Sequence, residues 1–262
     1  MSRFRPLAVA ALLALGACRA PAPVPLAPDD PRPAAWVSAW SQRAAQRQAL
    51  RAEARLAVDA EATGGADPVH VRSRQFLVMA RPAKLRIEVQ GMLGTTLAVL
   101  AIDDDVYALF ETESRRFEQG PVPADLLWRV ARLPLSAQEV VEVVLGAPDL
   151  ARGEPVRAAW ALSDGGLRVD LAGDAGPARL LRFDAEGQLR ELSARGADGA
   201  GWTARFDDYA PVAGEPLAHR VSIETLHANA VLQLRDVELN PALSADIFRL
   251  DGSLARSGAE GG

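Results

Sequence analysis

The chain has 262 residues, with 34 acidic and 29 basic side chains and a formal net charge of −5. The excess of acidic groups argues against nucleic-acid binding, which depends on Lys and Arg side chains that neutralise phosphates. Cys18 is the single cysteine, so a disulfide within the chain is excluded.

Residues 1–17 have the three parts of a secretory signal peptide. The basic segment Met1–Pro6 precedes the apolar stretch Leu7–Leu15, which is shorter than the roughly 20 residues of a membrane-spanning helix. The sequence Leu15–Cys18 (LGAC) resembles the lipobox of bacterial lipoproteins. This resemblance implies cleavage before Cys18 and acylation of its thiol. The alternative is an ordinary signal peptide with an incidental cysteine.

Residues 18–33 contain proline at nearly every second or third position, which predicts an extended spacer between the lipid anchor and the folded domain. Enterobacterial lipoproteins that stay in the inner membrane tend to carry Asp directly after the lipidated cysteine. Arg19 stands there in this chain, so the resemblance implies anchoring in the outer membrane, facing the periplasm of a Gram-negative bacterium.

A single folded domain is expected over residues 34–252, followed by a disordered tail at 253–262. A helix is predicted from about Ala34 to Leu50, with Trp36 and Trp40 on the face that packs against the domain.

Strict alternation of apolar and polar residues then predicts half-buried strands. The clearest are 85–90, 167–171 and 202–207. Further strand-like runs lie near 53–60, 69–80, 95–102, 105–112, 115–119, 156–162, 178–184, 188–194, 217–226 and 230–239. Tight turns between them indicate an antiparallel meander.

Residues 121–146 interrupt the strands with two predicted helices. Ser136 and Glu139 have the spacing of a capping box at the start of the second helix, and Gly146 follows its end. One curved sheet with helices on its concave side fits this order of elements. The fold class is therefore mainly β with helices.

Residues that would support catalysis are sparse. His70, His219 and His227 have no metal-ligand spacing, and no serine elbow or Gly-rich phosphate loop occurs. Asp103–Asp105 suits a hairpin turn better than a calcium loop. Glu111 and Glu113 would share one face of a strand, but no partner base or nucleophile is indicated. We expect neither an enzyme nor a cofactor or metal site.

The block at residues 85–97 (LRIEVQGMLGTTL) resembles the LolB family of outer-membrane lipoprotein receptors. The resemblance continues through three strand-like segments at 96–102, 106–111 and 115–118. It then includes the two helices joined by Leu133–Leu135, and the later segment 201–209. The resemblance covers roughly residues 50–240 and rests on the order of its motifs.

This resemblance implies an incomplete antiparallel β-barrel, or half-barrel, whose helices form a lid over an apolar cavity for acyl chains. It also implies a function: accepting lipoproteins from a LolA-like periplasmic carrier and placing them in the outer membrane, to which Cys18 anchors the chain. We expect a monomer.

The resemblance also assigns site residues. Leu93 occupies the place of the turn leucine that enters the membrane in LolB-like proteins, beside Met92 where the family commonly has proline. An exposed apolar tip suits contact with a membrane, although both side chains would also fit a turn that folds back onto the core. The candidates for the cavity wall are Leu85, Ile87, Val89, Val99, Phe110 and Trp128. In a filled core the same residues would only pack together.

The segment Asn240–Leu250 resembles the end of LolA-like carriers and related lipoproteins more than that of LolB. Two alternatives therefore stay open. The chain would be an anchored lipid- or glycolipid-binding lipoprotein without insertase activity, or a structural envelope lipoprotein with a filled core.

Overall fold

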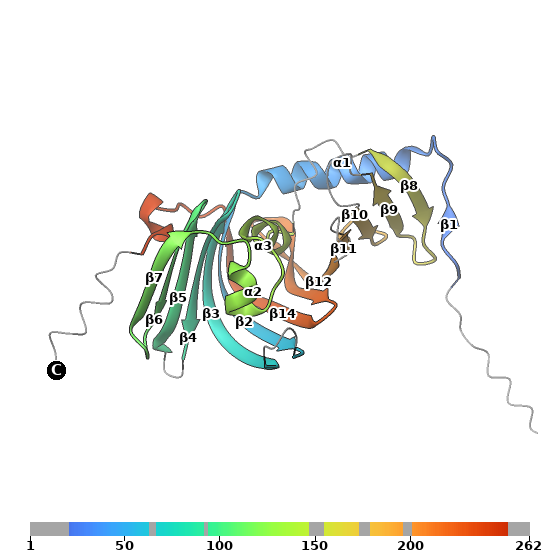
Figure 1. Ribbon diagram of the computed structural model, residues 1–262. Helices are drawn as coiled ribbons and strands as arrows, with labels where there is room; N and C mark the ends of the chain where they lie inside the picture. Colours follow the sequence, from blue (N-terminus) through green and yellow to red (C-terminus); the bar gives the residue numbers. More distant parts are fainter. Residues whose placement is uncertain are drawn as a thin grey trace, which may run out of the picture.

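The computed structural model describes residues 21–62, 67–91, 94–146, 155–172, 179–195 and 201–250. Within these ranges the chain forms one antiparallel sheet of 14 strands, in the order β1-β8-β9-β10-β11-β12-β13-β14-β2-β3-β4-β5-β6-β7. The sheet is strongly curved, with β1 and β7 at its two edges, and it does not close into a barrel (Figure 1). Two meanders, β2–β7 and β8–β14, are joined by the pairing of β14 with β2.

The first meander consists of β2 (Ala49–Ala60), β3 (Val69–Ala80), β4 (Lys84–Gln90), β5 (Thr96–Asp103), β6 (Val106–Glu111) and β7 (Arg116–Pro121). The second consists of β8 (Val156–Ala161), β9 (Leu167–Leu171), β10 (Arg179–Phe183), β11 (Leu189–Arg195), β12 (Gly201–Val212), β13 (Glu215–Thr225) and β14 (Ala228–Leu239). The remaining elements are β1 (Val24–Pro25), α1 (Pro31–Gln46), α2 (Leu126–Ala131), α3 (Ala137–Val144) and a 3-10 turn at Ala245–Phe248. The expected open antiparallel sheet with few helices is confirmed.

The proline-rich segment belongs to the fold from residue 24 onwards, whereas the sequence predicted a spacer up to residue 33. Val24–Pro25 pairs with β8 as the edge strand of the sheet. Proline is tolerated at an edge because its missing N–H breaks no hydrogen bond between interior strands. Helix α1 begins at Pro31 because proline at the first helical position lacks an N–H that would be unpaired there anyway. Asp30 caps the helix by accepting a hydrogen bond from the Arg32 backbone N–H at 3.0 Å.

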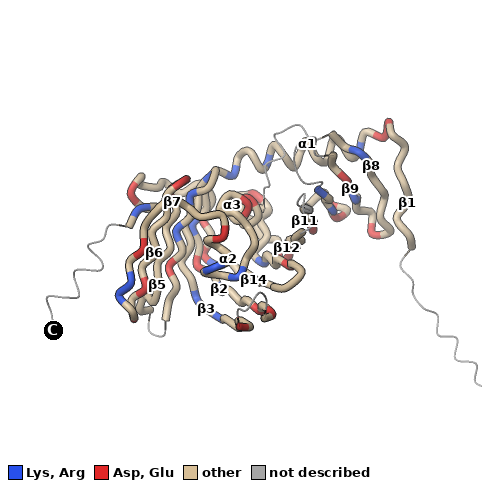
Figure 2. Tube along the Cα trace, viewed as in Figure 1, with Lys and Arg blue, Asp and Glu red and all other residues tan. Residues whose placement is uncertain are grey.

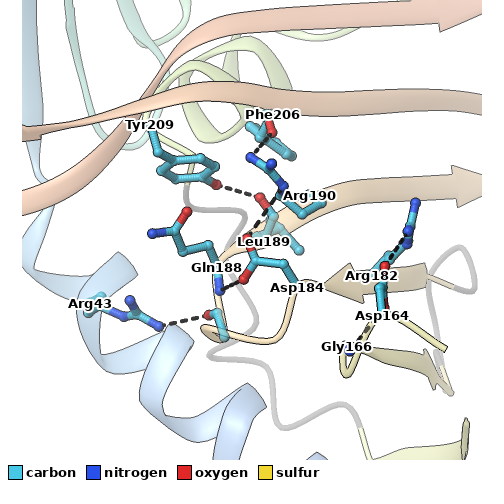
Figure 3. Close-up of polar contacts among 11 residues, drawn as sticks. Arg43, Asp164, Gly166, Arg182, Asp184, Gln188, Leu189, Arg190, Phe206 and Tyr209 are labelled. Carbon is cyan, nitrogen blue, oxygen red and sulfur yellow. Dashed lines mark hydrogen bonds and ion pairs between the residues drawn. The ribbon is translucent and has the colours of Figure 1, made fainter. Parts of the chain in front are cut away.

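Helix α1 packs against the second meander through its two tryptophans, as their spacing predicted. The rings of Trp36 and Trp40 lie edge-on to Phe183, with centroid distances of 6.0 and 6.5 Å. Arg43 donates a hydrogen bond at 3.1 Å to the Gly187 carbonyl in the turn between β10 and β11 (Figure 3). The same view shows the Tyr209 hydroxyl of β12 donating to the Leu189 carbonyl. The helix and the hairpin are thus held as one unit.

The convex face of β5–β7 carries a separate small apolar cluster. Val99, Ala101 and Ala108 are buried there together with Leu250, and Phe110 and Phe117 pack against them. The C-terminal segment therefore covers the outside of the first meander, which leaves the concave face to α2 and α3 (Figure 1).

Candidate functional site

A cavity of about 720 Å³ lies between the concave face of the sheet and the two lid helices, α2 and α3. This volume falls within the roughly 300–1,000 Å³ typical of ligand pockets. Most of its wall is aliphatic. The apolar residues on the strands are Leu56, Val58, Val69, Val71, Leu77, Met79, Leu85, Ile87, Val89, Ala98, Leu100, Leu109, Val221, Ile223, Ala230 and Leu232.

The alternation of a strand explains how the wall is built. Every second residue of β3, from Val69 to Met79, faces the cavity because successive side chains point to opposite faces of a sheet. Along this row the exposed fraction falls from 41% at Val71 to 1% at Met79. The cavity is therefore open at the Val69–Val71 end of β3 and closed at the end formed by Met79 and Leu85.

The lid helices supply the opposite wall. The cavity is lined from this side by Leu127 and Val130 of α2, by Leu133 in the segment between the two helices, and by Val140 and Val144 of α3. The predicted capping box starts α3, since the Ser136 Oγ accepts from the Glu139 N–H at 3.2 Å and Glu139 Oε2 accepts from the Ser136 N–H at 2.8 Å. The lid is attached to β12 because Trp202 Nε1 donates to Glu139 Oε1 at 3.3 Å.

A charged cluster lies on the rim of the cavity, where α2 meets the edge strand β7; Figure 2 shows basic positions, in blue, at α2 and directly after it. Glu118 accepts hydrogen bonds from the Tyr107 hydroxyl, from Arg129 Nη2 at 3.0 Å and from Arg116 Nη2 at 2.9 Å. The bonds from Tyr107 and Arg129 lower the pKa of Glu118, while Glu118 raises the pKa of Tyr107. This cluster joins α2 to the sheet through side chains that the sequence reasoning missed.

The predicted wall residues divide into two groups. Leu85, Ile87 and Val89 line the cavity. Val99 and Phe110 lie instead in the convex cluster, because the register pairs Ile87 with Leu100 and Leu100 with Leu109. Leu100 and Leu109 therefore take the cavity positions that the sequence reasoning gave to their neighbours.

Trp128 is not among the residues that line the cavity. It is half-buried on α2, with the Arg132 guanidinium 5.6 Å from its ring. Its neighbour Leu127 faces the cavity in its place, one helical position earlier.

Cys18, Met92 and Leu93 lie outside the described residues. The ends of the loop that contains Met92 and Leu93 are described. The Gly91 N–H donates to the Thr95 carbonyl at 2.7 Å, and Gly94 adopts a left-handed conformation with φ of +77° that glycine accepts most readily. The two described ends of the loop are therefore hydrogen-bonded to each other, and the roles of Met92 and Leu93 stay predictions.

In the described part of the chain, no three or more His, Cys, Asp or Glu side chains are grouped to hold a metal ion. None of its helices is long and apolar enough to cross a membrane.

The architecture is that of the LolA-like fold, an open antiparallel sheet wrapped around an apolar cavity. A LolA superfamily protein from Nitrosomonas europaea superposes with a TM-score of 0.57 at 12% identity, over 82% of this chain and 97% of that one. A DUF1329 family protein from Desulfovibrio piger superposes with a TM-score of 0.56 at 10% identity, over 84% of this chain and 98% of that one.

The sequence itself narrows the class further. The profile of the family "Outer membrane lipoprotein LolB" matches residues 48–235, and the chain belongs to this family. No curated protein matches it significantly in sequence. Membership of the family supports a role in binding and localising lipoproteins rather than in catalysis.

Proposed function

We propose that this protein is anchored in the outer membrane by lipid on Cys18 and accepts lipoproteins from a LolA-like periplasmic carrier. It holds their acyl chains in the cavity and inserts them into the outer membrane. The observation that carries this proposal is the aliphatic cavity of about 720 Å³ beneath α2 and α3, in a chain of the LolB family.

An acyl chain gains about 0.8 kcal/mol for each methylene removed from water. An apolar wall suits such a chain, and the side chains of β4 and β5 supply one through Ile87, Val89 and Leu100. The open end at Val69–Val71 gives the chain a route in and out without unfolding of the sheet. A lipid bilayer offers the same stabilisation to the acyl chain, so transfer from the cavity to the membrane needs little net free energy.

Leu93 is the proposed point of contact with the membrane. The hairpin of β4 and β5 carries wall residues on both strands and ends in the loop that contains Met92 and Leu93. A leucine on this loop would enter the bilayer close to the strands that hold the acyl chains.

The insertase proposal is tested with Leu93→Glu in a strain depleted of the native protein. We expect fewer lipoproteins in the outer-membrane fraction and more in the other fractions, because a carboxylate opposes entry into the bilayer. Membrane fractionation measures the distribution. Leu226→Glu is the matched control, since Leu226 is 83% exposed on the turn between β13 and β14. Normal insertion by the Leu93→Glu protein would favour an anchored lipid- or glycolipid-binding protein without insertase activity.

A further inference from the structure

Two polar residues interrupt the aliphatic wall on β3. Ser73 and Gln75 face the cavity between Val71 on the open side and Leu77 on the closed side. Gln75 pairs across the sheet with Ala54 of β2 and Val89 of β4, so its neighbours on the wall are apolar. The charged rim on β7 is four strands away in the sheet order.

The Gln75 side chain is buried, with an exposed fraction of 6%. Its amide has two N–H donors and one carbonyl acceptor. Among the described residues its hydrogen bond is the one from Nε2 to the Ser73 Oγ, at 3.2 Å. The second N–H and the carbonyl oxygen of this amide are left for a group inside the cavity that Gln75 lines. An amide kept at this position in a hydrocarbon wall is therefore suited to a ligand that carries a hydrogen-bonding group at the same depth.

The position of the pair along β3 indicates which group this is. Leu77 and Met79 continue the wall toward the closed end. At a rise of about 3.3 Å per residue, Met79 lies about 13 Å along the strand from Gln75. That stretch is apolar and suits hydrocarbon. On the other side, Val71 and Val69 lead to the mouth. A ligand with its polar junction at Gln75 would keep its hydrocarbon in the closed end and its head toward the mouth.

We propose that Ser73 and Gln75 form a hydrogen-bonding subsite for the carbonyl of the ester or amide that joins an acyl chain to its cargo. Gln75 Nε2 donates one N–H to the Ser73 Oγ and has a second for the ligand carbonyl. The Ser73 hydroxyl, as an acceptor from Gln75, has its own hydrogen free to donate. This inference rests on the proposed function, because it assumes that the cavity holds acyl chains.

The test compares three competitors that displace a fluorescent fatty-acid probe from the purified full chain. Methyl palmitate supplies an ester carbonyl, N-methylpalmitamide supplies an amide carbonyl, and hexadecyl methyl ether has the same chain length without a carbonyl. We expect at least one carbonyl compound to bind roughly two- to ten-fold more tightly than the ether, the effect of about one hydrogen bond. The stronger of the two identifies the linkage.

In Gln75→Leu we expect this preference to fall, because one of the two donors is lost, while the ether binds at least as well as before. Ser73→Ala should also reduce the preference, since it removes the hydroxyl donor and the acceptor that positions the Gln75 amide. Gln233→Leu is the matched control, because Gln233 alternates with the wall residue Leu232 and lies on the opposite face of β14. Urea denaturation of each variant checks that the fold is intact.

The outcomes separate this inference from the proposed function. Equal binding of all three competitors to the native chain would contradict the subsite and leave the apolar cavity standing. A preference that is undiminished in Gln75→Leu would also contradict it. Failure of every competitor and of the probe to bind would contradict the proposed function, and the subsite with it.

Discussion

At the scale of single residues, Arg47 follows α1 and contacts two distant parts of the chain. It is buried, and its guanidinium donates to the Leu145 carbonyl at 3.0 Å and to the Pro216 carbonyl at 2.7 Å. Burial lowers the pKa of Arg47. One side chain thus joins the end of α1 to the end of α3 and to the start of β13.

Arg47→Met should lower the free energy of unfolding by about 2–4 kcal/mol, because it leaves the buried Leu145 carbonyl and the part-buried Pro216 carbonyl without their donor. Urea denaturation measures the change. The control is Arg51→Met, which removes an exposed ion pair with Glu238 and should cost less than about 1 kcal/mol. Similar losses in both variants would show that Arg47 contributes no more than a surface charge.

Glu118, at the junction of α2 and β7, contributes to the stability of the fold in a way that depends on pH. Its pKa in the folded chain is lowered from its ordinary value of 4.5, first by the Tyr107 hydroxyl and then by Arg129. A lowered folded-state pKa stabilises the fold above the ordinary value, and this stabilisation is lost as the pH falls through the folded-state pKa. Acid should therefore weaken the attachment of the lid.

Acidification from pH 7 to about pH 3 should lower the free energy of unfolding of the native chain more than that of the Glu118→Gln variant, whose residue 118 has no carboxyl group to titrate. Urea denaturation at both pH values gives the comparison. Other carboxylates titrate in both proteins, so their difference isolates Glu118. An identical acid-induced loss in the two proteins would rule out a contribution from this group.

At the scale of elements, short-range signals account for α3 and most strands. The predicted strands at 69–80 and 167–171 have the observed bounds, and the capping box lies where Ser136 and Glu139 placed it. Prolines are the exception. Their low helix propensity led to the expectation of a spacer, but Pro31 stands at the one helical position that tolerates proline well.

Ser136→Ala should lower the free energy of unfolding by about 1 kcal/mol, because the Glu139 N–H in the first turn of α3 loses its capping acceptor, the Ser136 Oγ. Thermal denaturation followed by circular dichroism measures the loss. Ser38→Ala is the control, since Ser38 lies within α1 and its Oγ accepts only a long bond of 3.5 Å from Gln42. A loss in Ser136→Ala no larger than in Ser38→Ala would argue against the cap.

At the scale of the whole molecule, the cavity exists because the sheet curves around two short helices, with strands of both meanders in its wall. Ala98 of β5 is a small residue on its wall, while Leu97 beside it points to the opposite face and is half exposed. Ala98→Trp places an indole in the cavity, and Leu97→Trp places the same group outside.

We expect Ala98→Trp to bind a fluorescent fatty-acid probe at least about ten-fold more weakly, because the indole takes the space of the acyl chain. Leu97→Trp should bind it as the native chain does. Fluorescence titration gives both affinities. Equal affinities in the two variants would place the probe outside the cavity, and native mass spectrometry without co-purified lipid would then favour a filled core.

The sequence by itself determined the strands, the lid helices and the family, because alternation, helix caps and the order of short motifs are local properties of the chain. Cys18 and Leu93 were named from such motifs and stay predictions. Only the tertiary structure decided which face of each strand lines the cavity. Alternation divides β5 into two faces but does not say which is concave. The register between β4, β5 and β6 brings Leu100 and Leu109 beside Ile87, and it places Val99 and Phe110 under the C-terminal segment.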